Sequence, residues 1–156
     1  GQVMVAEIDP ARRLHAAYDG WHVVELQEAI ASADVVATAT GGKKVVNSQA
    51  LDKCKDGVFI LNVGHVAEEI DCEYLRQFSQ EEVMPYINAY RMGQKTIYLM
   101  ANGSMLNLTA GFGDSLNAFD VTLAVMASGI QHIVTDGMTA PADVYLLPQS
   151  VWQKAL

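Results

Sequence analysis

The sequence predicts an α/β protein built on a parallel sheet covered by helices. Short apolar runs recur along the first half of the chain and alternate with stretches of helical character, a pattern typical of strand–helix–strand units. Several of these runs end in small or polar residues, as strands do at a ligand-binding edge. With 156 residues, 51% of them apolar and 18% charged, the chain is long enough for one domain with a sizeable core.

Four strands and three helices are expected in the first half of the chain. The strands follow the apolar runs and are Val3–Glu7, Trp21–Val24, Asp34–Thr38 and Val58–Asn62. The helices between them are residues 10–18, 25–32 and 47–53. The first helix has the clearest boundaries, because Asp9 can cap it, Pro10 suits its first turn, and Asp19-Gly20 ends it.

The second half is expected to be less regular. Two extended runs, Glu82–Tyr90 and Thr96–Met100, are joined through Met92-Gly93-Gln94, a connection typical of a hairpin. A loop opens at Asn102-Gly103. Residues 115–134 have helical character, because large apolar side chains recur there at a spacing of three to four residues.

Composition and charge exclude several classes of partner. The net charge of −8 argues against nucleic acid or an anionic membrane, since both select a basic face. We recognise no signal peptide and no apolar run long enough to span a bilayer. Cys54 and Cys72 are too few for a disulfide framework, so we expect two free thiols in a reducing cytoplasm. No metal site is expected, because neither cysteine has ligand spacing around it and His15, His22 and His132 have none between them.

Three strand ends carry residues suited to binding a dinucleotide. A carboxylate at the end of the first strand, Glu7, can accept hydrogen bonds from both ribose hydroxyls of an adenosine; the alternative is a solvated acid that caps the next helix. Thr38-Ala39-Thr40-Gly41 and Asn62-Val63-Gly64-His65 follow two further strands, and small residues there let a flat ring lie against the backbone. Because the carboxyl ends of parallel strands share one edge, we expect the three turns to line one crevice.

With these residues assembled, the chain resembles S-adenosylhomocysteine hydrolases over almost its full length. The likeness runs through AEIDP, ATATGG, ILNVGHVAEEID and NGSMLNLTAGFG. It implies a Rossmann-like, doubly wound parallel sheet that lacks its first strand and glycine-rich loop, because both would lie before Gly1. It also implies a partial NAD-binding domain over residues 1–110, followed by a helix and C-terminal segment of the same fold unit over residues 111–156.

The resemblance assigns roles to individual residues. His65 matches a histidine at the junction of cofactor and substrate, and it is the expected catalytic residue; the alternative is a structural histidine after a glycine turn. The residues that match the family's NAD contacts are Glu7 at the adenosine ribose, Thr38, Ala39 and Thr40 along the cofactor, Asn62, Val63 and Gly64 near the nicotinamide, and Asn107 at its carboxamide.

The family's reaction explains why NAD stays bound. S-Adenosylhomocysteine is hydrolysed reversibly to adenosine and homocysteine: oxidation of the 3′ hydroxyl acidifies the 4′ proton, homocysteine is eliminated, water adds, and the ketone is reduced again. A histidine near the sugar could relay protons, since imidazoles titrate near neutrality. The resemblance therefore implies a cytoplasmic enzyme of the S-adenosylmethionine cycle. It further implies a small-molecule substrate, this thioether or a related purine nucleoside thioether, and a homo-oligomer that is a tetramer at full length.

Two departures from the family pattern leave alternatives open. The glycine-rich loop that presents N–H groups to a pyrophosphate would precede Gly1, so we expect the chain to be a piece of a longer enzyme, inactive alone. Asp114 stands where the family has a histidine that contacts adenosine, which favours an NAD-binding regulatory pseudoenzyme. The third reading is a D-2-hydroxyacid-dehydrogenase-type NAD domain, which would place an arginine–glycine pair where His65-Val66 stand.

The remaining charged residues are expected to have structural roles. Glu68, Glu69 and Asp71 are expected to be charges at the start of a helix, where the dipole favours acids. Lys43-Lys44 is expected to be a solvated turn. The high apolar content of residues 115–133 predicts an oligomer contact.

Overall fold

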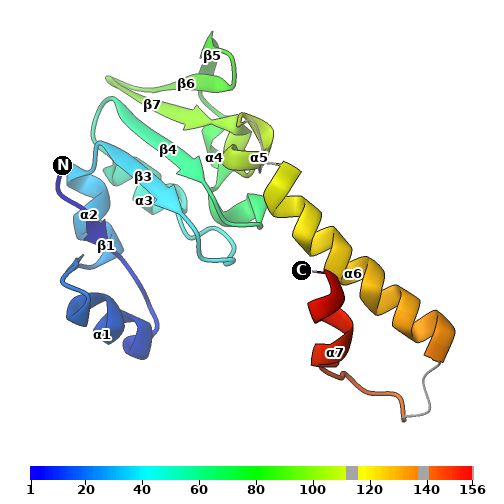
Figure 1. Cartoon of the computed structure of the whole chain (residues 1–156). Coiled ribbons are helices and arrows are strands. Elements are labelled where there is room, and N and C mark those ends of the chain that lie inside the picture. Colours follow the sequence, from blue (N-terminus) through cyan, green and yellow to red (C-terminus); the bar gives the residue numbers. More distant parts are fainter. Residues whose placement is uncertain (112–115, 137–140, 156) are drawn as a thin grey trace. The chain divides into compact units, whose positions relative to one another are not determined.

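The computed structural model describes residues 1–111, 116–136 and 141–155, and it has the predicted α/β class (Figure 1). Its chain forms two compact units, residues 1–112 and residues 113–156. Asp114, which stands where the resembled family has a histidine, lies outside the described residues. No helix within the described ranges is long and apolar enough to cross a membrane.

The main sheet of the first unit has five strands in the order β3-β4-β7-β6-β5. These strands are β3 (Val35–Thr38), β4 (Val58–Asn62), β5 (Ser79–Met84), β6 (Ile87–Met92) and β7 (Lys95–Met100). β3 and β4 run parallel, as predicted, β7 runs parallel to β4, and β5 and β6 add an antiparallel edge. Thr38 pairs with Asn62 in the register of β3 and β4, so these two strands end together.

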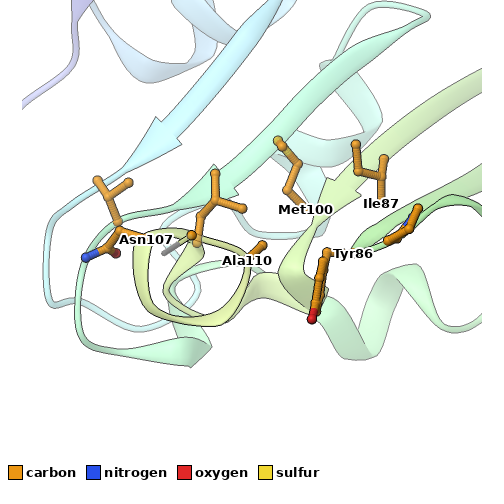
Figure 2. Close-up of a pocket in the computed structure, with 9 residues that line it drawn as sticks. Tyr86, Ile87, Met100, Asn107 and Ala110 are labelled. Atoms are coloured by element: carbon orange, nitrogen blue, oxygen red, sulfur yellow. The ribbon is translucent and has the colours of Figure 1, made fainter. Parts of the chain in front are cut away.

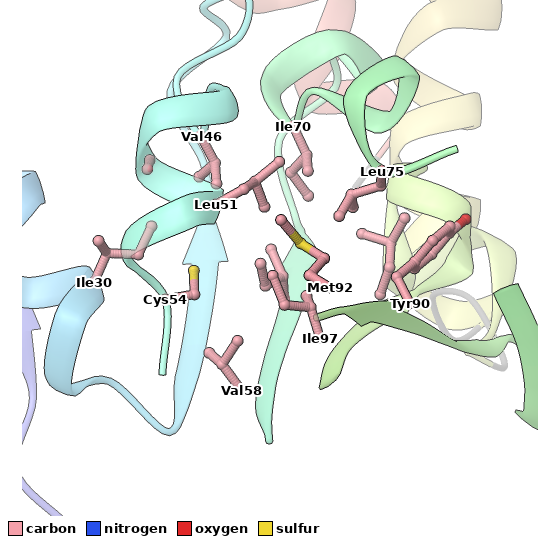
Figure 3. Close-up of a cluster of buried hydrophobic side chains, with 13 residues drawn as sticks. Ile30, Val46, Leu51, Cys54, Val58, Ile70, Leu75, Tyr90, Met92 and Ile97 are labelled. Carbon is pink, nitrogen blue, oxygen red and sulfur yellow. The ribbon is translucent and has the colours of Figure 1, made fainter. Parts of the chain in front are cut away.

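Short helices and turns accompany this sheet. They are α2 (Leu26–Ser32), α3 (Ser48–Lys53), α4 (Cys72–Leu75) and α5 (Leu106–Thr109), with 3-10 turns η1 (Ala67–Glu69) and η2 (Ala101–Gly103). Of these, α2, α3 and α4 supply buried apolar side chains to the core of the sheet. Asn47 caps α3 by accepting a hydrogen bond from Ala50 N at 3.0 Å. Figure 3 shows the resulting core, in which Ile30, Leu51 and Ile70 pack with strand residues such as Ile97.

The N-terminal segment is a separate, much less buried structure. β1 (Met4–Val5) and β2 (His22–Val23) form their own two-stranded parallel sheet. Both strands are shorter than predicted. α1 (Pro10–Tyr18) lies between them with the predicted boundaries, and Asp9 Oδ1 accepts hydrogen bonds at 2.9 Å from the N–H groups of the first helical turn. No residue of α1 is buried, because the small sheet has too little surface to cover it.

The predicted strand over Glu82–Tyr90 is wrong. The structure has two antiparallel strands there, β5 and β6, joined at Pro85-Tyr86. Proline fixes its own φ and Tyr86 has a φ of 66°, so the backbone turns where an extended run was expected. The hairpin prediction is confirmed one connection later, where β6 and β7 pair across Gly93-Gln94 and Gly93 has a φ of 66°.

The second unit is helical, as predicted. α6 (Leu116–Asp136) packs with α7 (Gln149–Trp152) and with the 3-10 turn η3 (Gln153–Ala155). Many of the apolar side chains of α6 nevertheless stay about half exposed within this unit, among them Phe119, Leu123, Met126 and Ile130.

Candidate functional site

The ends of β3 and β4 bring two of the three predicted turns together. Val63 N and Gly64 N donate to the carbonyl oxygen of Thr38 at 2.8 and 3.2 Å, so the turn after β4 is bonded to the end of β3. Gly41 lies beside His65, since a Cβ added at Gly41 would be 3.6 Å from His65 Cε1. The residues that follow the two strands therefore form one continuous surface at the carboxyl edge of the sheet.

A buried carboxylate lies beneath this surface. Glu69, at the end of η1, is fully buried. Its Oε2 accepts hydrogen bonds from Thr40 N at 2.9 Å and Thr40 Oγ1 at 2.7 Å, and its Oε1 accepts one from Gly41 N at 2.9 Å. Glu69 lies in η1, in agreement with the prediction of a charge at a helix start, but its hydrogen-bond partners lie in another turn of the fold, which the sequence did not predict. Glu68, the preceding acid, is exposed.

These hydrogen bonds keep Glu69 ionised. Burial by itself raises the pKa of this carboxyl, but hydrogen bonds from Thr40 and Gly41 outweigh that effect and hold the pKa below its ordinary value. No ion pair balances the charge within the described residues. Thr38 Oγ1 is near enough to lower the Glu69 pKa further, yet it is buried and has no hydrogen-bond partner of normal geometry in the described part of the chain.

Asn62 fixes the turn after β4 from inside the protein. Its side chain is fully buried, and its Nδ2 donates to Val66 O at 2.8 Å and to Gly103 O at 3.0 Å. Its Oδ1 accepts from Gly64 N at 2.7 Å. Since both of its donor hydrogens and its acceptor are used, Asn62 shapes the turn and leaves direct contact with a ligand to the residues that follow it.

Gly64 is required by its neighbours. A Cβ at this position would lie 2.1 Å from Glu69 Oε1 and 3.3 Å from Ala39 Cα, which no side chain tolerates. Ala39, Val63 and His65 are exposed, so the surface that the two turns present to solvent is made of small or apolar residues and one imidazole. A flat ring or a sugar could lie against such a surface.

A pocket of about 430 Å³ opens next to this surface and contains two of the predicted cofactor residues. Val63 and Asn107 both line it, because the pairing of Asn62 with Met105 holds the segment before α5 against the end of β4. Figure 2 shows Asn107 of α5 and Ala110, which follows this helix, on one side and Met100, Ile87 and Tyr86 on the other. The lining is mostly apolar with one amide, which suits an aromatic ring that carries a polar group.

Glu7 lies apart from the two joined turns, at the end of β1. It is half-buried, and its Oε1 accepts hydrogen bonds from Ile8 N at 2.7 Å and Asp9 N at 2.9 Å. Its Oε2 has no hydrogen bond within the described residues. Arg13 contacts only the Glu7 carbonyl oxygen, at 3.4 Å, and pairs instead with Glu25 at 2.7 Å. The carboxylate is thus oriented by its own backbone and retains a free oxygen.

No metal centre accompanies these residues in the part of the chain that the structure describes. No group of three or more His, Cys, Asp or Glu side chains there is arranged to hold an ion.

Comparisons with known proteins connect this geometry to one family. The family model described as "S-adenosyl-L-homocysteine hydrolase, NAD binding domain" matches residues 1–113. An S-inosyl-L-homocysteine hydrolase of Methanopyrus kandleri is 34% identical over 153 residues, which are 96% of this chain and 36% of that protein. An adenosylhomocysteinase of Archaeoglobus fulgidus is 31% identical over 151 residues, 96% of this chain and 37% of that protein.

The chain spans about a third of the length of these curated relatives. An adenosylhomocysteinase of Nostoc sp. gives the same proportion, with 33% identity over 156 residues, 97% of this chain and 36% of that protein. Among solved structures, an L-alanine dehydrogenase chain is similar over 100% of this chain and 47% of its own, with a TM-score of 0.43 and 14% identity.

Proposed function

The chain belongs to the S-adenosyl-L-homocysteine hydrolase family, whose NAD-binding domain it matches, and we propose that it forms the NAD-binding part of a longer thioether hydrolase. The observation that carries this proposal is the joined end of β3 and β4, where the turns that hold Ala39, Val63 and His65 form one exposed surface next to the pocket lined by Val63 and Asn107. A surface of small and apolar residues, with one amide in the adjoining pocket, fits a flat ring that carries a polar group.

The residues present suit NAD in distinct ways. Glu7 would accept hydrogen bonds from the adenosine ribose with its free Oε2. Thr38, Ala39 and Thr40 would lie along the cofactor, and Asn62 and Gly64 would hold the turn on which the nicotinamide half rests. Val63 and Asn107 would meet the nicotinamide from the pocket that they share, with the Asn107 amide facing the carboxamide. Bound NAD supplies the hydride acceptor and donor for oxidation and re-reduction at the sugar.

His65 is proposed as the proton-relaying residue of the whole enzyme. Its imidazole is exposed at the edge where the β3 and β4 turns meet, and it lies against Gly41. An exposed imidazole beside the cofactor could hold a proton at the reacting sugar, because histidine exchanges protons near neutral pH.

The proposed substrate is a homocysteine thioether of a purine nucleoside. S-Adenosylhomocysteine is the first candidate. S-Inosylhomocysteine is the second, because relatives from Methanopyrus kandleri and Methanocaldococcus jannaschii are described as S-inosyl-L-homocysteine hydrolases. A regulatory NAD-binding pseudoenzyme is the alternative outcome.

An assay of the full-length protein that contains this chain tests the proposal. The NAD-loaded protein should release homocysteine from one of the two thioethers, and Glu7→Gln should weaken NAD binding at least tenfold because it removes a charged ribose acceptor. Glu28→Gln, the same charge change at an exposed site in α2, should leave NAD binding unchanged. Bound NAD without homocysteine release would support the pseudoenzyme, and failure to bind NAD would overturn both.

Assembly and location form a further part of the proposal. We propose a cytoplasmic homo-oligomer, a tetramer at full length, in which the half-exposed apolar side chains of α6 become covered. Light scattering of the full-length protein tests this assembly. A monomer at micromolar concentration would contradict it.

A further inference from the structure

The Glu69 side chain contacts both proposed cofactor turns. Its two oxygens take three hydrogen bonds from Thr40 and Gly41, after β3. On its other side, Oε1 fills the space that a Cβ of Gly64, after β4, would occupy, only 2.1 Å away. The carboxylate therefore lies between the two turns, and its hydrogen bonds fix the position of the turn after β3.

The backbone around Glu69 is itself held in place. Val46 N donates to Glu69 O at 3.0 Å, and Asp71 N donates to Val46 O at 3.0 Å, so η1 is tied on both sides of Glu69 to the segment before α3. Nearby Lys44 pairs with Asp71 and Glu73 and so does not neutralise Glu69. The Glu69 backbone is thus held in place, and its charged carboxylate is available to the N–H groups of Thr40 and Gly41.

The chemistry of the three donors requires a carboxylate at this position. Two backbone N–H groups and one hydroxyl point at two oxygens, and only an ionised acid offers an acceptor to each of them. Glutamine has the same shape, but its NH₂ group would face an N–H donor and lose at least one of these bonds. Glu69→Gln therefore changes the turn with little change in side-chain volume.

We infer that Glu69 is a positioning residue, which sets the Thr38–Gly41 turn against the Asn62–His65 turn and thereby aligns the cofactor surface with His65; this inference rests on the proposed function. Glu69 does not touch the cofactor or substrate. It acts through Thr40, Gly41 and Gly64, and a displacement of about 1 Å in such a support costs on the order of 100-fold in rate.

The test compares variants of the full-length, NAD-loaded protein. Glu69→Gln should lower kcat/KM for thioether cleavage and weaken NAD binding, each by about 10- to 100-fold. Glu69→Asp keeps the charge with a shorter reach and should recover part of this loss. Glu68→Gln, the same charge change on the exposed neighbour, should behave like the wild type. A folded Glu69→Gln protein with unchanged NAD affinity and kcat/KM would overturn the inference.

Amide exchange in the wild-type protein covers the case in which Glu69→Gln does not fold. The N–H groups of Thr40 and Gly41 should exchange slowly and lose protection together when Glu69 is protonated at acidic pH, below the range of an ordinary glutamic acid. Fast exchange of both amides at neutral pH would overturn the inference. If the wild type binds no NAD, the proposed function fails while this exchange experiment still decides the role of Glu69.

Discussion

The chain has two proposed contact regions for a dinucleotide, and they differ in how many packing contacts and hydrogen bonds support them. The turns after β3 and β4 are bonded to each other and supported by Glu69 and Asn62, and β4 has Val58 and Ile60 fully buried in the core. Glu7 is oriented only by the two N–H groups that follow it, in a segment where Val24 is the one buried residue among residues 1–25. Packing therefore preorganises one end of the site, and local hydrogen bonds hold the other.

Exposed apolar side chains mark the same difference. Ile8 is 96% exposed, Tyr18 83% and Leu14 57%, all within or beside α1. In the five-stranded sheet, by contrast, Ile60, Ile97 and Leu99 have no exposed surface. Since apolar burial is the main source of folding free energy, the N-terminal segment gains little of its order from the core.

The largest expected effect is a loss of unfolding free energy when a buried side chain of the sheet is truncated. The same truncation of an exposed side chain in α1 should have little effect. Ile60→Ala removes methylene and methyl groups from the centre of β4 and should lower the free energy of unfolding by about 2–5 kcal/mol. Leu14→Ala in α1 should change it by less than about 0.5 kcal/mol. Urea denaturation followed by circular dichroism measures both. Equal losses would mean that α1 is packed as firmly as the sheet.

The sequence predicted best those features that depend on neighbours in the chain. Asp9 and Pro10 start α1, Asn47 starts α3, and the apolar run VFILN is β4 over the predicted residues. Caps and buried strands have local signatures, because the residues that form them also stabilise them. The side-by-side turns followed from the rule that parallel strands end at one edge.

Three features of the structure were not predicted from the sequence. Glu69 was assigned from its acidic neighbours, but its partners are 28 and 29 residues earlier in the chain, and no periodicity reveals such a pairing. Pro85 interrupts an otherwise extended run, and a proline inside such a run indicates the break that separates β5 from β6. The pocket residues Tyr86, in the turn between β5 and β6, and Met100, in β7, converge only in the folded sheet.

The second prediction asks whether the β3 and β4 turns are coupled as their contacts indicate. Gly64→Ala places a Cβ against Glu69 Oε1 and should destabilise the protein by about 1–3 kcal/mol. In a Glu69→Ala background the same change should cost at least about 1 kcal/mol less, since the clash is gone. Denaturation of the four proteins in this cycle gives the coupling energy.

A second double-mutant cycle, with Glu7 in place of Glu69, is the control. No contact joins Glu7 to Gly64 within the described residues, so Gly64→Ala combined with Glu7→Ala should be additive to within about 0.5 kcal/mol. Non-additivity here, or additivity in the cycle with Glu69, would reverse the comparison between the two regions.

A smaller effect is expected from the helix caps. Asn47→Ala removes the acceptor for Ala50 N and should lower the free energy of unfolding by about 1 kcal/mol, because α3 packs into the core. Asn47→Asp keeps the cap and should be close to the wild type. Asp9→Ala should loosen α1 alone, which amide exchange detects, without a matching change in global unfolding. A global loss from Asp9→Ala would show that α1 and the sheet unfold together.

The smallest expected effect is the response of α1 to pH. Hydrogen bonds from Arg12 N and Ala11 N hold the pKa of Asp9 below its ordinary value of 3.8. A carboxyl with a lowered pKa stabilises the folded helix above pH 3.8, and this contribution is lost as the pH falls below that value through the folded-state pKa. Amide exchange of α1 should therefore accelerate below about pH 4 more than the intrinsic rate predicts.

Asp9→Asn isolates this effect, because asparagine caps a helix about as well as aspartate but carries no titrating proton. The variant should keep α1 near neutral pH and lose the acid-dependent fraying. The Thr40 and Gly41 amides serve as an internal reference, since Glu69 also has a lowered pKa but lies in the packed region. If α1 frays in acid to the same extent with asparagine at residue 9, its order comes from contacts with the sheet, and the N-terminal segment is less independent than its exposure indicates.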